Sequence, residues 1–453
     1  MTVCFHVSSP LIPAPFAFAY HQHQLLSSQP SFIQCALTKQ GHRFLSTLSV
    51  KAGDSSAAHK LIGKFVAASP KSISLNALSH LLSPDTTHPH LTSHSLLLYS
   101  RIKEASWFEF NPKLVAALAA LLDKHGRYNE SEALISEAVS KLDRHRELAM
   151  FYCNLVESHS KQSSTHGFDS CYTQLYQLLC SSSSVYVKRR AFESMVSGLC
   201  TMDRPSEGES LMEEMRGNGL KPSVFEFRSL MYAYGRIGLL SDMLRIVHQM
   251  EDEGLVIDTI CSNMVLSSYG AHNDLPQMVS WLQKMKTSTI PFSIRTYNTV
   301  LNACPTISAM LQDLRNNIPL SMDELHGTLK GDEALLVKEL EGSQVLEEAM
   351  VWDSMEVKLD LHGMHLGSAY FIMLQWIEEM RSRFSLNNDG KPVVPAEVVV
   401  VCGSGKHSNV RGVSPVKTMI KEMMVRMKSP MRIDRKNAGC LIAKGKSVKD
   451  WLC

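Results

Sequence analysis

The strongest constraint on the fold is a sequence repeat with a period of 35 residues. Three successive segments carry apolar residues and turn signals at matching positions: residues 189–223, 224–258 and 259–293. Within them, apolar residues recur at spacings of three and four, as in Leu244, Val247 and Met250, which indicates short amphipathic helices. The pattern predicts two helices in each segment. These helices cannot bury their apolar faces alone, so the units must stack. The sequence predicts an α-helical solenoid of helix pairs.

The array extends beyond these three units. A partial repeat occupies residues 294–304, and weaker units are predicted within 114–142 and 147–181, so we place the whole array at residues 112–304. A helical lead-in is expected at residues 54–111. The chain has 453 residues, of which 44% are hydrophobic and 20% charged, which excludes wholesale disorder and suggests two to three domains.

The first 53 residues contain no Asp or Glu; the first acidic residue is Asp54. At the average frequency of 44 acidic residues in 453, about five would be expected in this stretch. An acid-free segment that contains serines is typical of an organellar transit peptide. Its single arginine, Arg43, favours a chloroplast over a mitochondrial presequence. The alternative is an N-terminal tail that lacks acidic residues by chance.

Charge divides the remaining chain. Lys and Arg total 46 and Asp and Glu total 44, a net charge of +2. Residues 305–358 hold 11 acidic residues against 4 basic ones, so we predict that 305–356 is a helical connector whose acidic surface repels phosphate. From Lys358 to Cys453 the balance inverts to 16 basic against 8 acidic residues. The 11 cysteines form no Cys-x-x-Cys pair, which argues against a zinc ribbon.

The hydrophobic period also changes in the last segment, residues 357–453. Four short stretches have strand character: 357–361, 397–402, 431–434 and 439–443. An amphipathic helix is predicted over 366–384, and Ser414 with Pro415 opens a second helix as N-cap and first-turn proline. Strands that alternate with helices predict a compact, small α/β sandwich. No apolar run is long enough to span a membrane.

Two motifs in this segment suggest chemistry at strand ends. Asp360 and His362 are two residues apart and therefore on the same face of a strand. A glycine-containing loop follows the 397–402 strand, and such loops bring backbone N–H groups and a cation to a phosphate. Its candidate phosphate-binding residues are Gly403, Ser404, Gly405, Lys406, His407, Ser408 and Arg411. It is neither a Walker A loop nor a dinucleotide fingerprint.

The repeats resemble the pentatricopeptide repeat family. The resemblance rests on the 35-residue period, the Tyr-Asn-Thr-Val-Leu stretch from Tyr297, the Ala-Tyr-Gly-Arg-x-Gly turn from Ala233 and the Met-x-x-x-Gly-Leu-Lys-Pro end from Met215. It implies that each repeat reads one nucleotide of single-stranded RNA through two positions. The implied base-reading residues are Glu193 with Ser223, Arg228 with Asp258, Asn263 with Ser293, and Asn298. A helical array that binds protein is the alternative.

The last 95 or so residues resemble the small MutS-related domain. The matching features are Leu359-Asp-x-His362, the Gly-x-Gly loop at 403–405, the Ser414-Pro415 step and the ending Val448-Lys-Asp-Trp-Leu. Cys402 and Ser404 depart from residues frequent in that family. Because some members are nucleases, the resemblance implies that Asp360 and His362 are catalytic, with Asp360 as a ligand of Mg²⁺. The alternative is that the pair stabilises a turn.

Together these features predict an organellar, chloroplast RNA-binding factor that acts in RNA processing, stability or translation. Two other functions remain open at this stage. One is a Mg²⁺-dependent, site-directed endoribonuclease. The other is a scaffold whose repeats bind proteins of the organellar gene-expression machinery.

Overall fold

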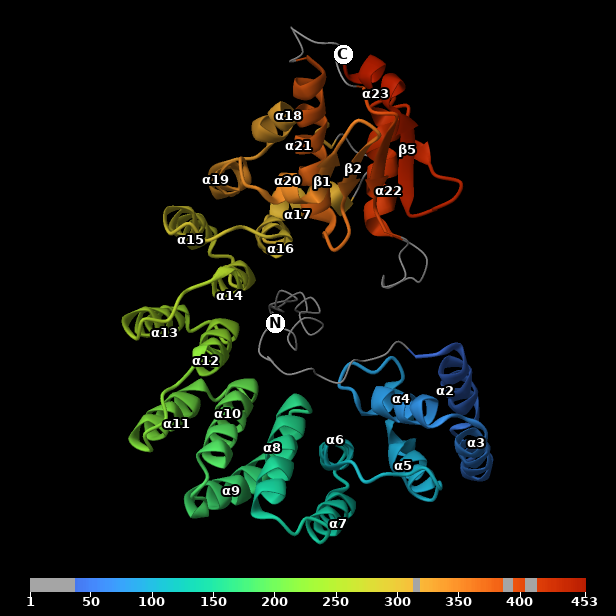
Figure 1. Ribbon diagram of the computed structural model, residues 1–453, viewed down its shortest axis with the longest axis vertical. Coiled ribbons are helices and arrows are strands. Elements are labelled where there is room, and N and C mark those ends of the chain that lie inside the picture. The colour runs from blue at the N-terminus through green and yellow to red at the C-terminus, as the bar shows by residue number, and fades with distance from the viewer. Residues whose placement is uncertain (1–36, 313–317, 386–393, 404–413) are drawn as a thin grey trace, which may run out of the picture. The chain divides into compact units, whose positions relative to one another are not determined.

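The computed structural model describes residues 37–312, 318–385, 394–403 and 414–453. The described elements from residue 39 to residue 349 are helices, and a small sheet with its own helices follows (Figure 1). It divides into two compact units, residues 1–233 and 234–453. Each unit is described by itself.

The first unit begins with a packed group of helices. In order, these are α2 (Lys39–Lys51), α3 (Ser55–Ala68), α4 (Lys71–Leu82), the 3-10 helix η2 (Pro89–His94) and α5 (Ser95–Lys103). Helix α2 packs on α3 and α4, buries Leu45 and Leu48, and stacks Phe44 on Phe65 with ring centroids 3.7 Å apart. Part of the segment predicted as a transit peptide, residues 1–53, is therefore a folded helix. Residues 1–36 lie outside the described part.

Three helix pairs follow in the first unit. They are α6 (Pro112–Lys124) with α7 (Tyr128–Val139), α8 (His145–Lys161) with α9 (Thr165–Ser181), and α10 (Val185–Thr201) with α11 (Pro205–Gly217). The first helices of successive pairs pack on one another, α6 on α8 and α8 on α10. The first two pairs lie where the weaker repeats were expected. The predicted solenoid of helix pairs is confirmed.

The second unit continues the same pattern. It contains α12 (Val224–Arg236), whose residues are divided between the units, then α13 (Leu240–Asp252), α14 (Thr259–Ala271), α15 (Leu275–Thr287) and α16 (Ile294–Asn302). Neighbouring first helices approach closely at glycine. A Cβ on Gly235 would lie 2.0 Å from Ser268 Oγ of α14, so no other residue fits there without a shift.

The turns between helices share a left-handed residue. Gly219, Gly254 and Thr289 end the second helices with φ of 74°, 74° and 54°. After each of them, the next N–H bonds back to a carbonyl five residues earlier, as in Ile290 to Met285 at 2.8 Å. This pattern is a Schellman cap, which favours glycine at the left-handed position. Thr289 fills that position without glycine's conformational freedom.

The predicted acidic connector is helical, and one of its helices packs on the repeats. It contains α17 (Pro305–Gln312), α18 (Met322–Thr328), α19 (Gly331–Leu340) and α20 (Val345–Ala349). Helix α19 packs on α15 and α16, and Glu339 accepts hydrogen bonds from Gln283 at 3.0 Å and Lys286 at 2.8 Å. Part of the acidic charge is thus neutralised by repeat side chains.

A five-stranded sheet forms the end of the chain. Its strands are β1 (Met350–Trp352), β2 (Glu356–Asp360), β3 (Glu397–Val401), β4 (Arg432–Ile433) and β5 (Cys440–Lys444), in the spatial order β1-β2-β3-β5-β4. Only β2 and β3 are parallel. Because β1 belongs to the sheet, the sheet begins at Met350, within the 305–356 range that the sequence assigned to the connector.

The helices of this domain are α21 (Leu366–Ser385), α22 (Pro415–Arg426) and α23 (Gly445–Leu452). Burial alternates along β2 and β3, with Val357, Leu359, Val398 and Val400 on the buried face. The predicted cap of α22 is confirmed, since Ser414 Oγ accepts the Lys417 N–H at 3.2 Å and Pro415 occupies the first turn. The domain therefore combines one sheet with helices, as predicted. Helix α21 differs from the predicted amphipathic helix, because every residue from Gly367 to Leu374 is buried.

Candidate nucleic-acid interface

The two C-terminal motifs meet at one edge of the sheet. Asp360 ends β2 opposite Val401 at the end of β3, and Gly403 lies two residues beyond Val401. Gly403 has a φ of 78°, and a Cβ built on it would lie 3.8 Å from His362 Nδ1. Because β2 and β3 are parallel, their carboxyl ends share an edge, which is a common place for ligand sites in α/β sheets.

Asp360 shapes the turn at this edge. Its Oδ1 accepts the His362 N–H at 2.9 Å, and His362 itself is exposed. This is the turn-stabilising contact that the sequence left open as an alternative to catalysis. Among the described residues, no hydrogen bond engages the second carboxylate oxygen of Asp360 or the His362 ring.

Most of the predicted phosphate loop lies outside the described residues. This applies to Ser404, Gly405, Lys406, His407, Ser408 and Arg411. Within the described ranges, no group of three or more His, Cys, Asp and Glu side chains is placed to hold a metal ion. No described helix is both long enough and apolar enough to cross a membrane.

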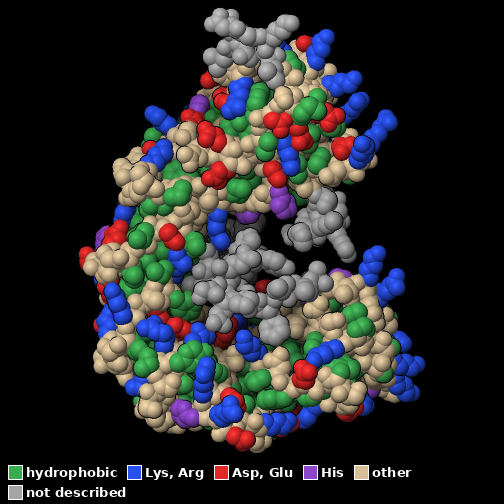
Figure 2. Space-filling model, viewed as in Figure 1, with side chains coloured by type: hydrophobic (Ala, Val, Ile, Leu, Met, Phe, Trp, Pro, Cys, Tyr) green, Lys and Arg blue, Asp and Glu red, His purple; other side chains and the backbone are tan. Residues whose placement is uncertain are grey.

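Basic side chains gather elsewhere on the C-terminal domain. Figure 2 shows Lys and Arg side chains along the edge that carries α22, β5 and α23. Residues 417–449 contain ten Lys or Arg against two Asp or Glu. Such a density of positive charge attracts phosphate groups over distances of about 8–10 Å at physiological salt.

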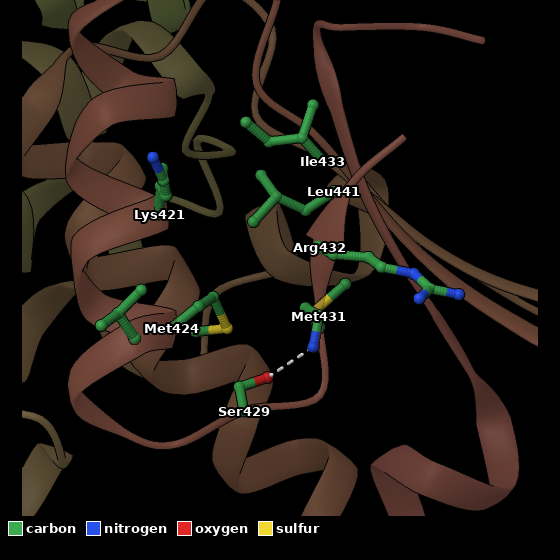
Figure 3. Close-up of a pocket in the computed structure, with 8 residues that line it drawn as sticks. Lys421, Met424, Ser429, Met431, Arg432, Ile433 and Leu441 are labelled. Carbon is green, nitrogen blue, oxygen red and sulfur yellow. Dashed lines mark hydrogen bonds between the residues drawn. The ribbon is translucent and has the colours of Figure 1, made fainter. Parts of the chain in front are cut away.

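A small apolar cavity opens between α22 and the β4–β5 pair (Figure 3). Its volume is about 280 Å³, and its apolar lining includes Met424, Met431 and Leu441, with Lys421 and Arg432 beside them. Ser429 Oγ accepts the Met431 N–H at 3.2 Å and fixes the turn below the cavity. The predicted site residues are not among those that line it.

The residues at the repeat ends act as helix N-caps. Asp258 Oδ1 accepts the Cys261 N–H at 2.9 Å, and Ser293 forms a capping box with Thr296. Ser223 Oγ accepts the Phe225 N–H at 3.2 Å and donates to Glu226 at 2.7 Å. Each of these base-reading candidates thus starts the next helix.

Their partners on the first helices differ in environment. Asn263 is buried, and its Nδ2 donates to Ser293 Oγ at 3.3 Å, so this predicted pair is in contact. Glu193 is half-buried and accepts from Arg190 at 2.5 Å; burial raises its pKa, and Arg190 opposes that shift. Arg228 is half-buried on α12.

Asn298 is bonded to a distant part of the chain. It lies on α16, and its Nδ2 donates to the Gly363 carbonyl at 3.0 Å. Its Oδ1 accepts the His365 N–H at 2.8 Å and the Ser368 hydroxyl. Sequence comparison between repeats could not reveal these partners, because they lie 65 to 70 residues away along the chain.

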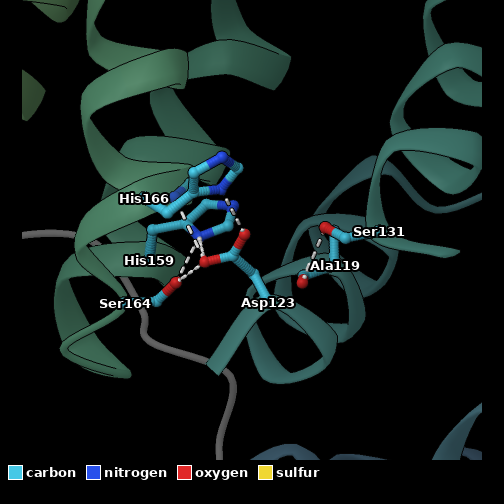
Figure 4. A network of polar contacts seen from close by, with 7 residues as sticks. Ala119, Asp123, Ser131, His159, Ser164 and His166 are labelled. Carbon is cyan, nitrogen blue, oxygen red and sulfur yellow. Dashed lines mark hydrogen bonds and ion pairs between the residues drawn. The ribbon is translucent and has the colours of Figure 1, made fainter. Parts of the chain in front are cut away.

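A second polar network, which the sequence did not suggest, lies in the first unit (Figure 4). Asp123 is buried and accepts from Ser164, from His166 Nδ1 at 3.0 Å and from the Gly167 N–H at 3.1 Å. His159 Nδ1 lies 3.2 Å from Ser164 Oγ. Ser164 donates directly to the carboxylate, whereas a hydrolytic triad needs histidine between the two groups. This network joins α6, α8 and α9.

Comparison with known proteins agrees with the repeat architecture. The pentatricopeptide repeat domain model matches residues 210–272 and 245–306, and a second repeat model matches residues 190–220. The pentatricopeptide repeat-containing protein At2g17033 of Arabidopsis thaliana is 60% identical over 420 residues, covering 92% of this chain and 82% of the relative. The chain belongs to the pentatricopeptide repeat family.

More distant family members are also similar. The chloroplastic protein ATP4 of Zea mays is 18% identical over 278 residues, which cover 58% of this chain and 39% of the maize protein. The crystal structure of maize PPR10 matches with a TM-score of 0.38 and 14% identity, covering 85% of this chain and 51% of that one. PPR10 in complex with an 18-nt psaJ RNA element matches with a TM-score of 0.27, 13% identity, 67% of this chain and 46% of that one.

Proposed function

We propose that this pentatricopeptide repeat protein is a single-stranded RNA-binding factor of the chloroplast, acting in RNA processing, stability or translation. The observation that carries the proposal is the contact between Asn263 and Ser293, the two positions through which repeats of this family are expected to read a base. The basic C-terminal domain adds charge that holds phosphates without sequence preference.

RNA binding is tested by titration of the purified chain with a randomised single-stranded RNA pool at several salt concentrations. Affinity should fall steeply as salt rises, because each phosphate contact releases counterions. Asn263→Asp should change the base selected at one position and leave the salt slope unchanged. A chain that retains no RNA even at low salt would instead favour the protein-binding scaffold.

We further propose that the C-terminal domain is a small MutS-related domain with endoribonuclease activity. The observation in favour is that Asp360, His362 and Gly403 share one edge of the sheet. His362 would hold or move a proton near neutral pH. Mg²⁺ is commonly bound by one or two carboxylates together with substrate phosphates, so Asp360 would hold the ion once RNA supplies further oxygens.

The nuclease is tested by mapping new 5′ ends after incubation of plastid RNA with the chain and Mg²⁺. Asp360→Asn preserves an acceptor for the His362 N–H and removes the charge, so it should abolish cleavage while RNA retention stays unchanged. Arg381→Gln, outside the edge, serves as the matched control. Equal cleavage by wild type and Asp360→Asn would exclude the assigned role.

Chloroplast location is proposed from the acid-free N-terminus and from relatives named as chloroplastic. Since α2 buries its apolar face against α3 and α4, cleavage of a transit peptide should occur before Thr38. Import into isolated chloroplasts followed by N-terminal sequencing tests both statements. A mature end within or after α2 would contradict this boundary, and import only by mitochondria would contradict the location.

A further inference from the structure

The C-terminal domain occupies the end of the repeat array. First helices pack in a row, α14 on α16, and α16 in turn packs on α21 of the C-terminal domain. Second helices are continued in the same way, since α19 packs on α15 (Figure 1). Helix α21 therefore takes the position of the next first helix, and α19 that of the next second helix.

Asn298 lies at the point where the array meets this domain. It is 35 residues after Asn263 and has the same position on its helix. Both asparagines are buried, but the amide nitrogen and oxygen of Asn298 are both engaged, with Gly363, His365 and Ser368. An amide held in this way has little remaining capacity to recognise a base edge. By contrast, Asn263 Oδ1 has no hydrogen-bond partner among the described residues.

The residues that Asn298 binds immediately follow the Asp360–His362 motif. Gly363 and His365 belong to the turn from β2 into α21, and Ser368 lies in the first turn of α21. Two further contacts restrain the same segment. Asn302 Nδ2 donates to His365 Nδ1 at 2.6 Å. A Cβ on Gly367 would lie 3.1 Å from Leu301 Cβ, so α21 approaches α16 closely at this glycine. The turn is therefore fixed relative to the last repeat helix.

We propose that Asn298 is a positioning residue that sets the register between the repeats and the Asp360–His362 edge. RNA that lies along the first helices passes from the Asn263–Ser293 pair to His362, with no base read at Asn298. Asn302, His362 and His365 are exposed, and Asn302 contacts His365, so these polar side chains would face the RNA between the last repeat and the edge. This inference rests on the proposed RNA function, and it fixes which nucleotide the C-terminal domain meets.

The test uses the full chain and a randomised single-stranded RNA pool. Selections by wild type and by Asn263→Asp first identify the nucleotide at Asn263, as the position whose base preference changes. Single 4-thiouridines are then placed at successive positions of the selected RNA and cross-linked by light. Mass spectrometry identifies cross-links to the tryptic peptide that contains residues 359–381.

Cross-links in wild type should concentrate on one nucleotide at a constant, short offset from the marked position. Asn298→Ala should bind RNA as tightly as wild type but spread the cross-links over several positions. Ser368→Ala, which removes one of the three partners, should spread them less and serves as the second variant if Asn298→Ala does not fold. A circular dichroism spectrum checks folding of both.

Two results would overturn the inference while RNA binding stands. One is a cross-link pattern that stays at a single position in both folded variants, or in Ser368→Ala alone if the other is unfolded. The second is a change of base preference at a separate position after Asn298→Asp, which would make Asn298 a base-reading residue. Failure of wild type to retain any RNA at low salt would instead defeat the proposed function itself.

Discussion

Asn263 and Asn298 occupy the same position in consecutive repeats, yet their surroundings differ. Asn263 on α14 contacts the N-cap serine at the end of its own repeat. Asn298 on α16 bonds to three residues of the C-terminal domain. The side chain and the helix position are the same, so the difference comes from the element that packs beside each helix. The repeat position fixes where the side chain lies on its helix. The element packed against that helix determines which groups the side chain contacts.

The largest loss of stability is expected when the Asn298 side chain is removed. Asn298→Ala removes three hydrogen bonds, to the Gly363 carbonyl, the His365 N–H and the buried Ser368 hydroxyl. Each contributes about 1 kcal/mol net, so the free energy of unfolding should fall by about 3 kcal/mol. Asn263→Ala, which loses one 3.3 Å hydrogen bond, should cost about 1 kcal/mol or less. Urea denaturation of both variants measures the contrast. Equal losses would mean that the C-terminal contacts contribute no stability.

The Asp123–His159 network of the first unit contains charged groups, unlike the contacts around Asn298. Its stability should therefore depend on pH. Burial lowers the pKa of His159 to about 4, so the unfolded chain takes up this proton below about pH 6.5 while the folded chain resists it. Burial favours a higher pKa for Asp123, but hydrogen bonds from Ser164, His166 and Gly167 outweigh it and lower the pKa. Both shifts make the folded state lose stability as pH falls.

Thermal unfolding between pH 7 and 4 should therefore show a loss of a few kcal/mol, since one pKa unit corresponds to about 1.4 kcal/mol. His159→Gln should flatten the dependence over the interval between about pH 6.5 and 4. His145→Gln, at an exposed position on the same helix, should leave it unchanged. An unaltered profile in His159→Gln would rule out this histidine as the source.

Gly235 lies where two helices pack closely, whereas Gly217 in the other unit has free space at the position that a Cβ would occupy. Gly235→Ala places a methyl group against Ser268, and overpacking of this kind costs about 1–3 kcal/mol. Ser268→Gly should recover part of the loss. Gly217 ends α11 with nothing within 4 Å of the position that a methyl group would occupy, so Gly217→Ala should be neutral or slightly stabilising. Chemical denaturation of the three variants measures these effects.

The smallest effect concerns the left-handed turn residues. Thr289 has a φ of 54° where the two preceding repeats have glycine at the same position. A non-glycine residue in this region costs about 1–2 kcal/mol, so Thr289→Gly should stabilise the chain by about 1 kcal/mol. Gly254→Thr should destabilise it by a similar amount. A destabilising effect of Thr289→Gly would show that the threonine side chain contributes more than its backbone strain costs.

Local patterns in the sequence predicted the local structure well. The 35-residue period reflects units that each bury an apolar face on their neighbours, so the helix pairs and the solenoid follow from spacing alone. Ser414 and Pro415 marked the start of α22 because capping is a local interaction. Alternation at Val357 and Leu359 marked β2, since every second residue of a half-buried strand is apolar.

Contacts between distant segments were not predictable in this way. The short strand β1, at the end of an acidic helical stretch, was not predicted, because three residues are too few for a periodic signal. The partners of Asn298 depend on how α21 packs on α16, which no repeat pattern encodes. The candidate edge at Asp360, His362 and Gly403 could be anticipated only because both motifs lie at the ends of predicted strands. The predicted placement of Asp360 and His362 on one face of a strand was wrong, since β2 ends at Asp360 and His362 lies in the following turn.

The bonds of Asn298 also have a consequence for the order in which the chain is made. Its partner Ser368 is 70 residues further on, so α16 leaves the ribosome long before its final contacts exist. Earlier repeats find a neighbour within the next helix pair and can fold as they emerge. The last repeat has to wait until the sheet domain has been synthesised. Vectorial folding of the array should therefore pause at its final unit.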